Sequence, residues 1–188
     1  MDFSLITPLM NVIRTQIYPS PLGDLLLGDW RGALVLCDWL LTCNGYASDS
    51  RVPHHLRAVM QEAVTDLLCE AAAQLNAYFV GRLRTFNLPL HGAGTPFQQS
   101  VWQALRAIPY GATCSYQDIA QAIGNPRGTR AVAGAIRHNP LSVIVPCHRV
   151  IGKNGQLTGY NGGTDALYIK ERLLALEQRV AASAAPKN

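Results

Sequence analysis

The sequence has little charge and no long apolar run, and both absences limit what the protein can be. Only 15% of its 188 residues are charged and 48% are hydrophobic, which predicts a folded protein with a sizeable core. No apolar stretch reaches the roughly 20 residues that cross a bilayer. The first ten residues contain Asp2 and no basic side chain, unlike a secretory signal. We therefore expect a cytoplasmic protein with no membrane partner.

The cysteines lack the paired spacing of metal sites. There are five of them, an odd number, scattered at Cys37, Cys43, Cys69, Cys114 and Cys147. Such usage is typical of a reduced protein without a disulfide framework. We expect no bound metal and no cofactor.

Acidic residues are absent between Asp118 and Asp165. Five basic residues fall inside that stretch: Arg127, Arg130, Arg137, Arg149 and Lys153. Residues 1–97 carry six basic and eight acidic side chains, whereas residues 98–179 carry nine basic and four acidic ones. A charge run is usually a solvated face, but an acid-free stretch of this length fits a surface that binds a polyanion better.

The first half of the chain has the pattern of a small α/β domain. Short extended runs between residues 17 and 39, separated by Gly-Asp and Arg-Gly, predict a small antiparallel sheet. Apolar residues at three- and four-residue spacing predict a helix over 56–79, after irregular chain over 43–55. A linker with proline and glycine follows. We place the domain boundary there, giving an N-terminal α/β domain over 1–93 whose residues 1–14 form a loosely held arm.

The second half, residues 94–180, is predicted to be mostly helical. Thr95 and Gln98 have capping-box spacing around Pro96, which marks a helix start. Two short helices over 115–123 and 128–137 are joined by a tight turn, the pattern of a helix-turn-helix. The expected fold class is therefore an α/β N-terminal domain followed by a mostly α, winged-helix-like C-terminal domain.

The second of these two helices carries Arg130 and Arg137 beside alanine and glycine. Small residues would let the helix backbone approach a nucleic acid closely, although they serve close helix packing equally well. A last helix is predicted over 165–179, and residues 181–188 form a small, polar tail that we expect to be disordered.

The stretch Val143–Ile151 places a cysteine and a histidine side by side in an apolar, β-branched run. Such a run predicts a buried strand that breaks at Pro146. The plain interpretation of Cys147 is a small core hydrophobe. As a nucleophile it needs a base, and His148 on a strand would point to the opposite face, so a bridging water is required. A base is usually oriented by a third group.

The same stretch resembles the active-site signature of the O6-alkylguanine-DNA alkyltransferases. Further motifs of that family occur in its order and spacing over residues 95–177: Thr95-Pro96-Phe97-Gln98, Val101-Trp102, Ile108-Pro109-Tyr110-Gly111, Ser115-Tyr116, Gly124-Asn125-Pro126, Arg130-Ala131-Val132, Asn139-Pro140, Gly162-Gly163 and Lys170 to Glu177. Residues 17–93 agree with the family's N-terminal α/β domain more loosely.

The resemblance implies direct repair of O6-alkylguanine, and of O4-alkylthymine, in double-stranded DNA. Cys147 would take the alkyl group irreversibly, so that each molecule acts once. His148 would be the base, working through water, and Glu177 its orienting partner. Asn139 would tie the site together, and Tyr116 would help to extrude the nucleotide and donate a proton toward guanine.

The resemblance also implies which residues meet DNA. Arg130 would fill the gap left in the base stack as the motif's second helix enters the minor groove. The remaining expected DNA contacts are Gln117, Asn125, Arg137 and Lys153. The alkylguanine pocket would be formed by Tyr116, Val150, Tyr160 and Asn161, with backbone carbonyls of Cys147 and Val150. The expected protein is a monomer of bacterial type with access to the chromosome.

Two departures from the family pattern bear on the site. The segment Thr164 to Ile169 is longer than usual, so either Glu177 or Glu171 remains open as the partner of His148, with Glu177 preferred. His138 stands where a small residue is commoner, so it would either add a DNA contact or only face solvent, and we expect it to face solvent.

Three other functions compete with repair. A non-catalytic alkyltransferase-like protein would bind damaged DNA, but such proteins replace the cysteine that is present here at Cys147. A general thiol hydrolase would need an oxyanion-hole motif, and none is evident. A helix-turn-helix transcription factor usually dimerises, and no dimerisation segment is seen.

Overall fold

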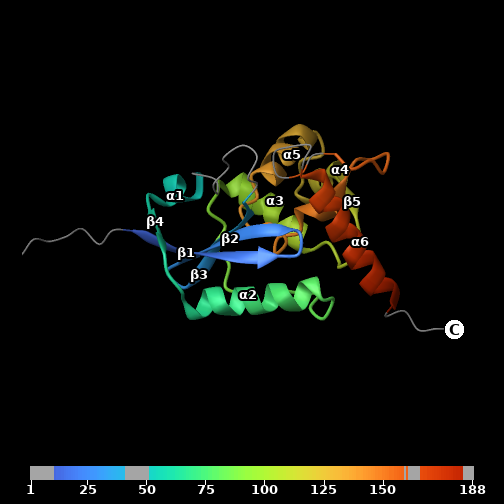
Figure 1. The fold of residues 1–188 in the computed structure, drawn as a ribbon. Helices are drawn as coiled ribbons and strands as arrows, with labels where there is room; N and C mark the ends of the chain where they lie inside the picture. Colours follow the sequence, from blue (N-terminus) through green and yellow to red (C-terminus); the bar gives the residue numbers. More distant parts are fainter. Residues whose placement is uncertain (1–10, 41–50, 159, 161–165, 184–188) are drawn as a thin grey trace, which may run out of the picture.

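The structure is a computed structural model that describes residues 11–40, 51–158, 160 and 166–183 (Figure 1). Its N-terminal part holds a four-stranded sheet in the order β3-β2-β1-β4 and two helices. These elements are β1 (Val12–Ser20), β2 (Gly23–Trp30), β3 (Ala33–Trp39), α1 (Arg51–Leu56), β4 (Val59–Glu62) and α2 (Asp66–Phe79). The C-terminal part contains α3 (Pro96–Arg106), β5 (Cys114–Ser115), α4 (Tyr116–Ala122), α5 (Thr129–Arg137), the 3-10 helix η1 (Cys147–Arg149), β6 (Val150–Ile151) and α6 (Leu167–Ser183).

The predicted antiparallel sheet is confirmed for β1, β2 and β3. The β2–β3 hairpin turns through Arg31 and Gly32, both with positive φ, at 55° and 79°. A two-residue turn of this kind matches the twist of the flanking strands. The sheet as a whole is mixed, because β4 pairs with β1 in parallel.

The helix predicted over 56–79 was wrong for residues 57–65. Residues 51–56 form α1, Val59–Glu62 form β4, and α2 begins only at Asp66. The side chain of Thr65 caps α2 by accepting a hydrogen bond from Leu68 N. All four residues of β4 are exposed, so its apolar members do not mark a buried helix face.

Two further boundaries predicted from the sequence, at the two ends of the chain, differ from those in the structure. Val12 to Arg14 belong to β1, so the expected arm over 1–14 was wrong for those residues, and residues 1–10 lie outside the described part. Helix α6 continues to Ser183, so the predicted tail was wrong for 181–183, and residues 184–188 lie outside the described part.

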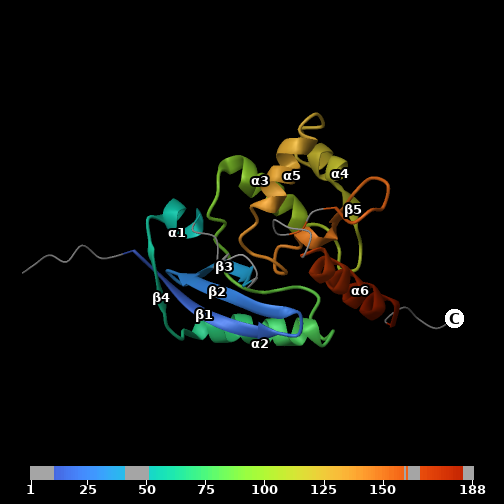
Figure 2. The ribbon, with the colours of Figure 1, turned by 45° about the horizontal axis from the view of Figure 1, so that its top comes forward.

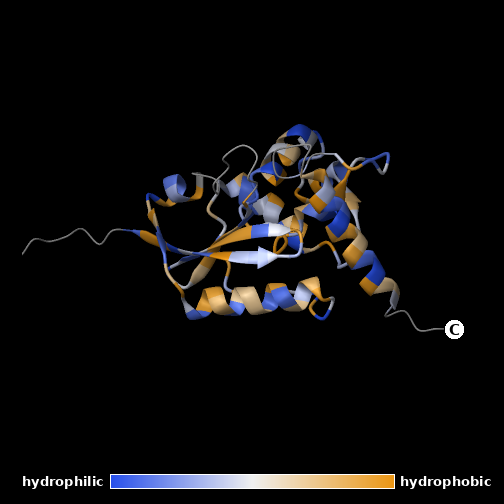
Figure 3. Ribbon diagram, in the orientation of Figure 1, coloured by the Kyte–Doolittle hydropathy of each residue, from blue (hydrophilic) through white to orange (hydrophobic). Residues whose placement is uncertain are grey.

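Helix α2 covers one face of the sheet, and α3, α4 and α5 lie together on the other side (Figures 1 and 2). Figure 3 shows α2 mostly in hydrophobic colours. Its buried residues Leu68, Ala71, Leu75 and Tyr78 pack against the sheet. The hydroxyl of Tyr18 on β1 also donates to Asn76 Oδ1 at 2.8 Å, which fixes the helix over the strands.

The helix starts of the C-terminal part are confirmed. Thr95 and Gln98 form a capping box at α3, and Ser115 forms one with Asp118 at α4. Helices α4 and α5 follow each other as a helix-turn-helix, and β5 pairs with β6 in parallel beside them. The fold class predicted from the sequence is confirmed.

The two halves share one buried cluster. It joins Leu34 and Tyr78 of the first half to Val101 and Cys147 of the second. Backbone bonds also cross between them, including Cys37 N to Pro140 O at 2.9 Å. The division at residue 93 stays a prediction. Among the helices of the described residues, none has the length and apolarity to cross a membrane.

Candidate active site

Cys147 opens a short 3-10 helix rather than lying on a strand, so the strand expected over 143–146 was wrong. The residues just before it, 141–145, form a turn that is closed by a hydrogen bond from Val145 N to Leu141 O at 2.8 Å. The buried side chain of Asn139 supports this turn: its Nδ2 donates to Val145 O at 2.9 Å, and its Oδ1 accepts from Leu141 N at 3.1 Å. Val143 has φ of 72°, a strained value for a β-branched residue.

The thiol of Cys147 is protonated in this environment. The side chain is 7% exposed. Burial, with a smaller contribution from the charge of Asp38, raises the pKa of the Cys147 thiol to about 11, against the lowering effects of a hydrogen bond from Asn139 and the charge of Lys170. A thiol of this kind needs a base before it can act as a nucleophile.

His148 lies directly beside it and is held by Glu177. The ring atom Nε2 of His148 is 2.9 Å from Glu177 Oε1, and both side chains are fully buried. Burial lowers the pKa of His148 below its usual value, although Glu177 opposes this, so the ring is neutral at neutral pH. A carboxylate only accepts hydrogen bonds, so Nε2 carries the proton and Nδ1 has the free lone pair. Nδ1 is buried and has no hydrogen-bond partner among the described residues.

Glu177 is the centre of a network of donors. Its carboxylate accepts from the hydroxyl of Tyr78 at 2.8 Å, from Gly111 N at 3.0 Å and from Nε and Nη2 of Arg149, each at 2.9 Å. Burial alone would raise the pKa of Glu177, but the bonds from His148 and Arg149 outweigh it and hold that pKa well below its usual range. The contact to His148 is made by Glu177, whereas Glu171 is exposed on α6.

Two members of this network, and the nearby Lys170, were not expected as site residues from the sequence. Tyr78 was expected as an apolar position of the helix predicted over 56–79 and as part of the loose agreement with the family's N-terminal domain, yet it reaches Glu177 from the other half of the chain. Arg149 was counted in the basic stretch, but it is buried and also donates to Ile108 O at 2.7 Å. Lys170 is buried and donates to Val150 O at 2.6 Å and Thr158 O at 3.0 Å, and burial lowers its pKa to about 8. The one signal in the sequence that could have identified Arg149 and Lys170 as buried site residues is that each is a charged residue among apolar neighbours.

Three of the four expected pocket residues, Tyr116, Val150 and Tyr160, lie near Cys147. The hydroxyl of Tyr116 donates to Thr158 O at 3.0 Å, and burial raises the pKa of Tyr116, so it stays protonated. The side chain of Val150 is buried, and Tyr160 is 4% exposed and close enough to Cys147 for the two to interact electrostatically. Asn161 lies outside the described residues.

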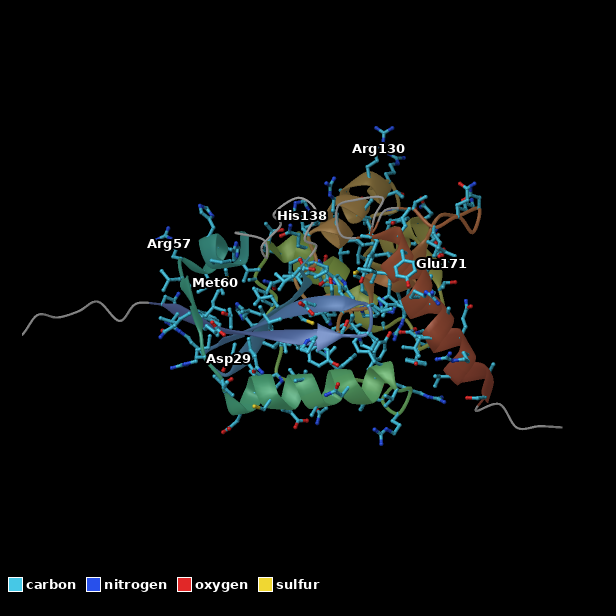
Figure 4. All side chains as sticks on the ribbon, viewed as in Figure 1. Asp29, Arg57, Met60, Arg130, His138 and Glu171 are labelled. Atoms are coloured by element: carbon cyan, nitrogen blue, oxygen red, sulfur yellow. The ribbon has the colours of Figure 1, made fainter. Side chains whose placement is uncertain are left out.

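The expected DNA-contact residues divide into two groups. Arg130, Arg137, Asn125 and Lys153 are exposed. Arg130 projects from α5 away from the body of the molecule (Figure 4). Gln117 is half-buried instead, and its amide braces the motif by donating to Pro126 O at 2.9 Å and accepting from Thr129 at 2.7 Å.

The small residues of α5 divide between helix packing and open surface. Ala135 is buried, and its carbonyl accepts from Trp102 Nε1 at 2.9 Å, which joins α5 to α3. Ala131 is exposed, and a Cβ added at Gly134 would meet nothing within 4 Å. His138 is half-buried and is bonded through Nδ1 to Gly134 O at 2.6 Å.

The chain matches known proteins along most of its length. The family model described as "6-O-methylguanine DNA methyltransferase, DNA binding domain" matches residues 96–179. The methylated-DNA–protein-cysteine methyltransferase of Methanosarcina acetivorans is 46% identical over 162 residues, which cover 86% of this chain and 96% of the relative. The enzyme of the same name from Methanosarcina mazei is 54% identical over 168 residues, covering 89% and 96%. The crystal structure of Mycobacterium tuberculosis OGT in complex with DNA superposes with a TM-score of 0.72 at 41% identity, covering 90% of this chain and 94% of that one.

Proposed function

Because the chain belongs to the family of methylated-DNA–protein-cysteine methyltransferases, we propose that it repairs O6-alkylguanine in double-stranded DNA by moving the alkyl group onto Cys147. Membership of that family makes the protein an enzyme of DNA alkyl repair. The proposal adds the reacting residues, the single turnover and the extrusion of the damaged nucleotide.

One observation carries the proposal: the 2.9 Å contact between His148 Nε2 and Glu177 Oε1. Because Glu177 fixes the proton of the neutral ring on Nε2, the basic nitrogen is Nδ1. We assign Nδ1 the role of taking the proton of the Cys147 thiol through one bridging water molecule. The resulting imidazolium is stabilised by the charge of Glu177, as in other nucleophile–base–carboxylate sites.

The transfer step then balances as follows. The Sγ thiolate attacks the alkyl carbon, the new S–C bond forms, and the bond from that carbon to guanine O6 breaks. Guanine gains one proton from the hydroxyl of Tyr116. The proton that His148 took from the thiol finally replaces the one that Tyr116 gave up. The product is a thioether, which water does not hydrolyse, so each molecule reacts once. O4-alkylthymine presents the same alkyl–oxygen bond and is expected to react as well.

The target atom must leave the base stack before it can meet Cys147. Extrusion of a base costs a few kcal/mol, and an inserted side chain offsets part of that cost. We assign the insertion to Arg130, which the exposed tip of α5 would carry into the minor groove, with Asn125, Arg137 and Lys153 on the backbone. Gln117 would support the helix-turn-helix motif rather than make a main contact with DNA, since its amide is already hydrogen-bonded to Pro126 and Thr129.

The extruded base would lie against Val150, Tyr160 and Asn161, beside Tyr116. A monomer suffices for this arrangement, because every proposed reacting group comes from one chain. We place the protein in the cytoplasm, where it has access to the chromosome.

The test uses a short duplex with one O6-methylguanine and intact-protein and peptide mass spectrometry. The wild-type protein is expected to gain one methyl group on the peptide that contains Cys147, with guanine restored in the DNA, and C147A is expected to gain none. C114A is the matched control, because burial also raises the pKa of Cys114 to about 11 without a neutral histidine beside it. Binding of the lesion by wild-type protein without any gain of methyl would contradict the transfer and indicate a non-catalytic alkyltransferase-like protein.

A further inference from the structure

Two neighbouring residues of β3 reach across to the active site from the N-terminal sheet. Trp39 Nε1 donates to the hydroxyl of Tyr160 at 3.1 Å, across 121 residues of sequence. Ser142 Oγ donates to Asp38 Oδ1 at 3.0 Å, across 104 residues. The Ser142 hydroxyl also lies close enough to the Tyr160 hydroxyl to lower the pKa of Tyr160, against the larger effect of burial. The four side chains therefore form one connected polar chain that begins and ends on β3.

The direction of every bond in this chain is determined by chemistry. An indole N–H can only donate, so Tyr160 must accept from Trp39. A carboxylate can only accept, so Ser142 must donate to Asp38. The hydroxyl of Tyr160 is thus left to donate to Ser142. Bonds aligned in one direction polarise and strengthen one another at low dielectric.

The strand that carries both ends of the chain is firmly held. Trp39 is 2% exposed, and Asp38 Oδ1 also accepts from Trp39 N at 3.0 Å. The neighbouring Cys37 N donates to Pro140 O at 2.9 Å, beside Asn139 and the turn that leads to Cys147. Both side-chain and backbone hydrogen bonds therefore connect β3 to the site.

We propose that Asp38 and Trp39 are positioning residues of the alkyl-transfer site, which hold the Tyr160 ring as a fixed wall beside Cys147. The inference rests on the proposed function, in which Tyr160 lines the alkylguanine pocket. A fixed wall matters most for a small alkyl group, because a methyl makes few contacts of its own to set its distance from sulfur. A bulkier group such as benzyl brings its own contacts and tolerates a looser ring.

The test compares rate constants of alkyl transfer from O6-methylguanine and from O6-benzylguanine in the same duplex. W39F removes the indole N–H and keeps an apolar ring. A net hydrogen bond is worth about a fivefold change, so methyl transfer is expected to slow about fivefold and benzyl transfer less, which shifts the ratio of the two rates. In a Y160F background, where the accepting hydroxyl is absent, W39F should leave the ratio unchanged.

The matched control is W30F. Trp30 also donates its indole N–H to a side chain, Asn11 Oδ1 at 2.6 Å, but in the other hydrophobic cluster away from Cys147. If W39F does not fold, S142A breaks the same chain from the other side and leaves Trp39 intact. Thermal unfolding of each variant separates lost folding from lost positioning.

The outcomes are distinct. A ratio that is shifted by W39F, or by S142A where W39F does not fold, and that is unchanged by W30F and insensitive in the Y160F background supports the inference. A W39F protein with the ratio of wild type, or with the same shift in both backgrounds, overturns it while the proposed function stands. A wild-type protein that gains no alkyl group overturns the proposed function and the inference together.

Discussion

At the residue scale, the charge of Glu177 should govern how stability depends on pH. Its folded-state pKa lies below the unfolded value of about 4.3, so its stabilising bonds are fully present above that pH and are lost as the pH falls toward the folded-state pKa. E177Q removes this charge and leaves the buried Arg149 unpaired. We expect a loss of roughly 3–5 kcal/mol in the free energy of unfolding at pH 7.

The measurement is urea unfolding of wild type and E177Q at pH 7, 5 and 4. The difference between the two proteins should shrink as the pH falls below about 4.3, because Glu177 then takes up a proton in the unfolded wild-type chain while it stays ionised in the folded one, which lowers the stability of the wild type. E171Q, at an exposed position of the same helix, is expected to match wild type throughout. A difference that stayed constant over the whole range would mean that Glu177 stabilises by shape alone.

At the scale of single elements, the backbone of α5 is uncovered at Gly134, where there is room for a side chain. Because a Cβ there would meet nothing within 4 Å, G134L should fold well and gain up to about 1 kcal/mol in helix propensity. A leucine on this face would hold DNA away from the helix. We expect affinity for duplex DNA to fall at least tenfold while the melting temperature stays the same or rises.

The control is A175L, at an exposed position of α6 outside the helix-turn-helix motif, and both variants are measured by fluorescence anisotropy with a labelled duplex. Should G134L bind DNA as tightly as wild type, this face of α5 would not be the one that approaches DNA.

The elements differ in how well local sequence determines them. The capping boxes of α3 and α4 were predicted correctly because the residues that make them lie three apart and act locally. The strand β4 was missed because its partner β1 lies far away in sequence and supplies the backbone bonds that hold it. The β-branched run 143–146 was predicted as a strand, but the buried amide of Asn139 turns it through bonds that no periodicity reveals.

At the scale of the whole molecule, the site draws on both halves of the chain. The sequence placed all the reacting residues between 94 and 180, and the short-range pair of Cys147 and His148 was evident from it. The choice of Glu177 rested on matching the last helix to a family pattern across a longer segment. Tyr78, Asp38 and Trp39 could not be predicted as site residues, because only the packing of the N-terminal sheet and α2 against the site brings them there.

The uneven charge of the molecule predicts a strong dependence of DNA binding on salt. The exposed cations around the helix-turn-helix, Arg130, Arg137 and Lys153, would displace counterions from phosphates. Affinity for an undamaged duplex should fall linearly in log–log form as salt rises, and K153A should reduce the slope by about one. R82A is the control, because Arg82 is exposed just beyond the end of α2, a helix that lies on the opposite side of the sheet from α5 (Figure 2). If K153A and R82A reduced the slope equally, attraction to DNA would come from overall charge, and the acid-free stretch would not form a defined DNA-binding face.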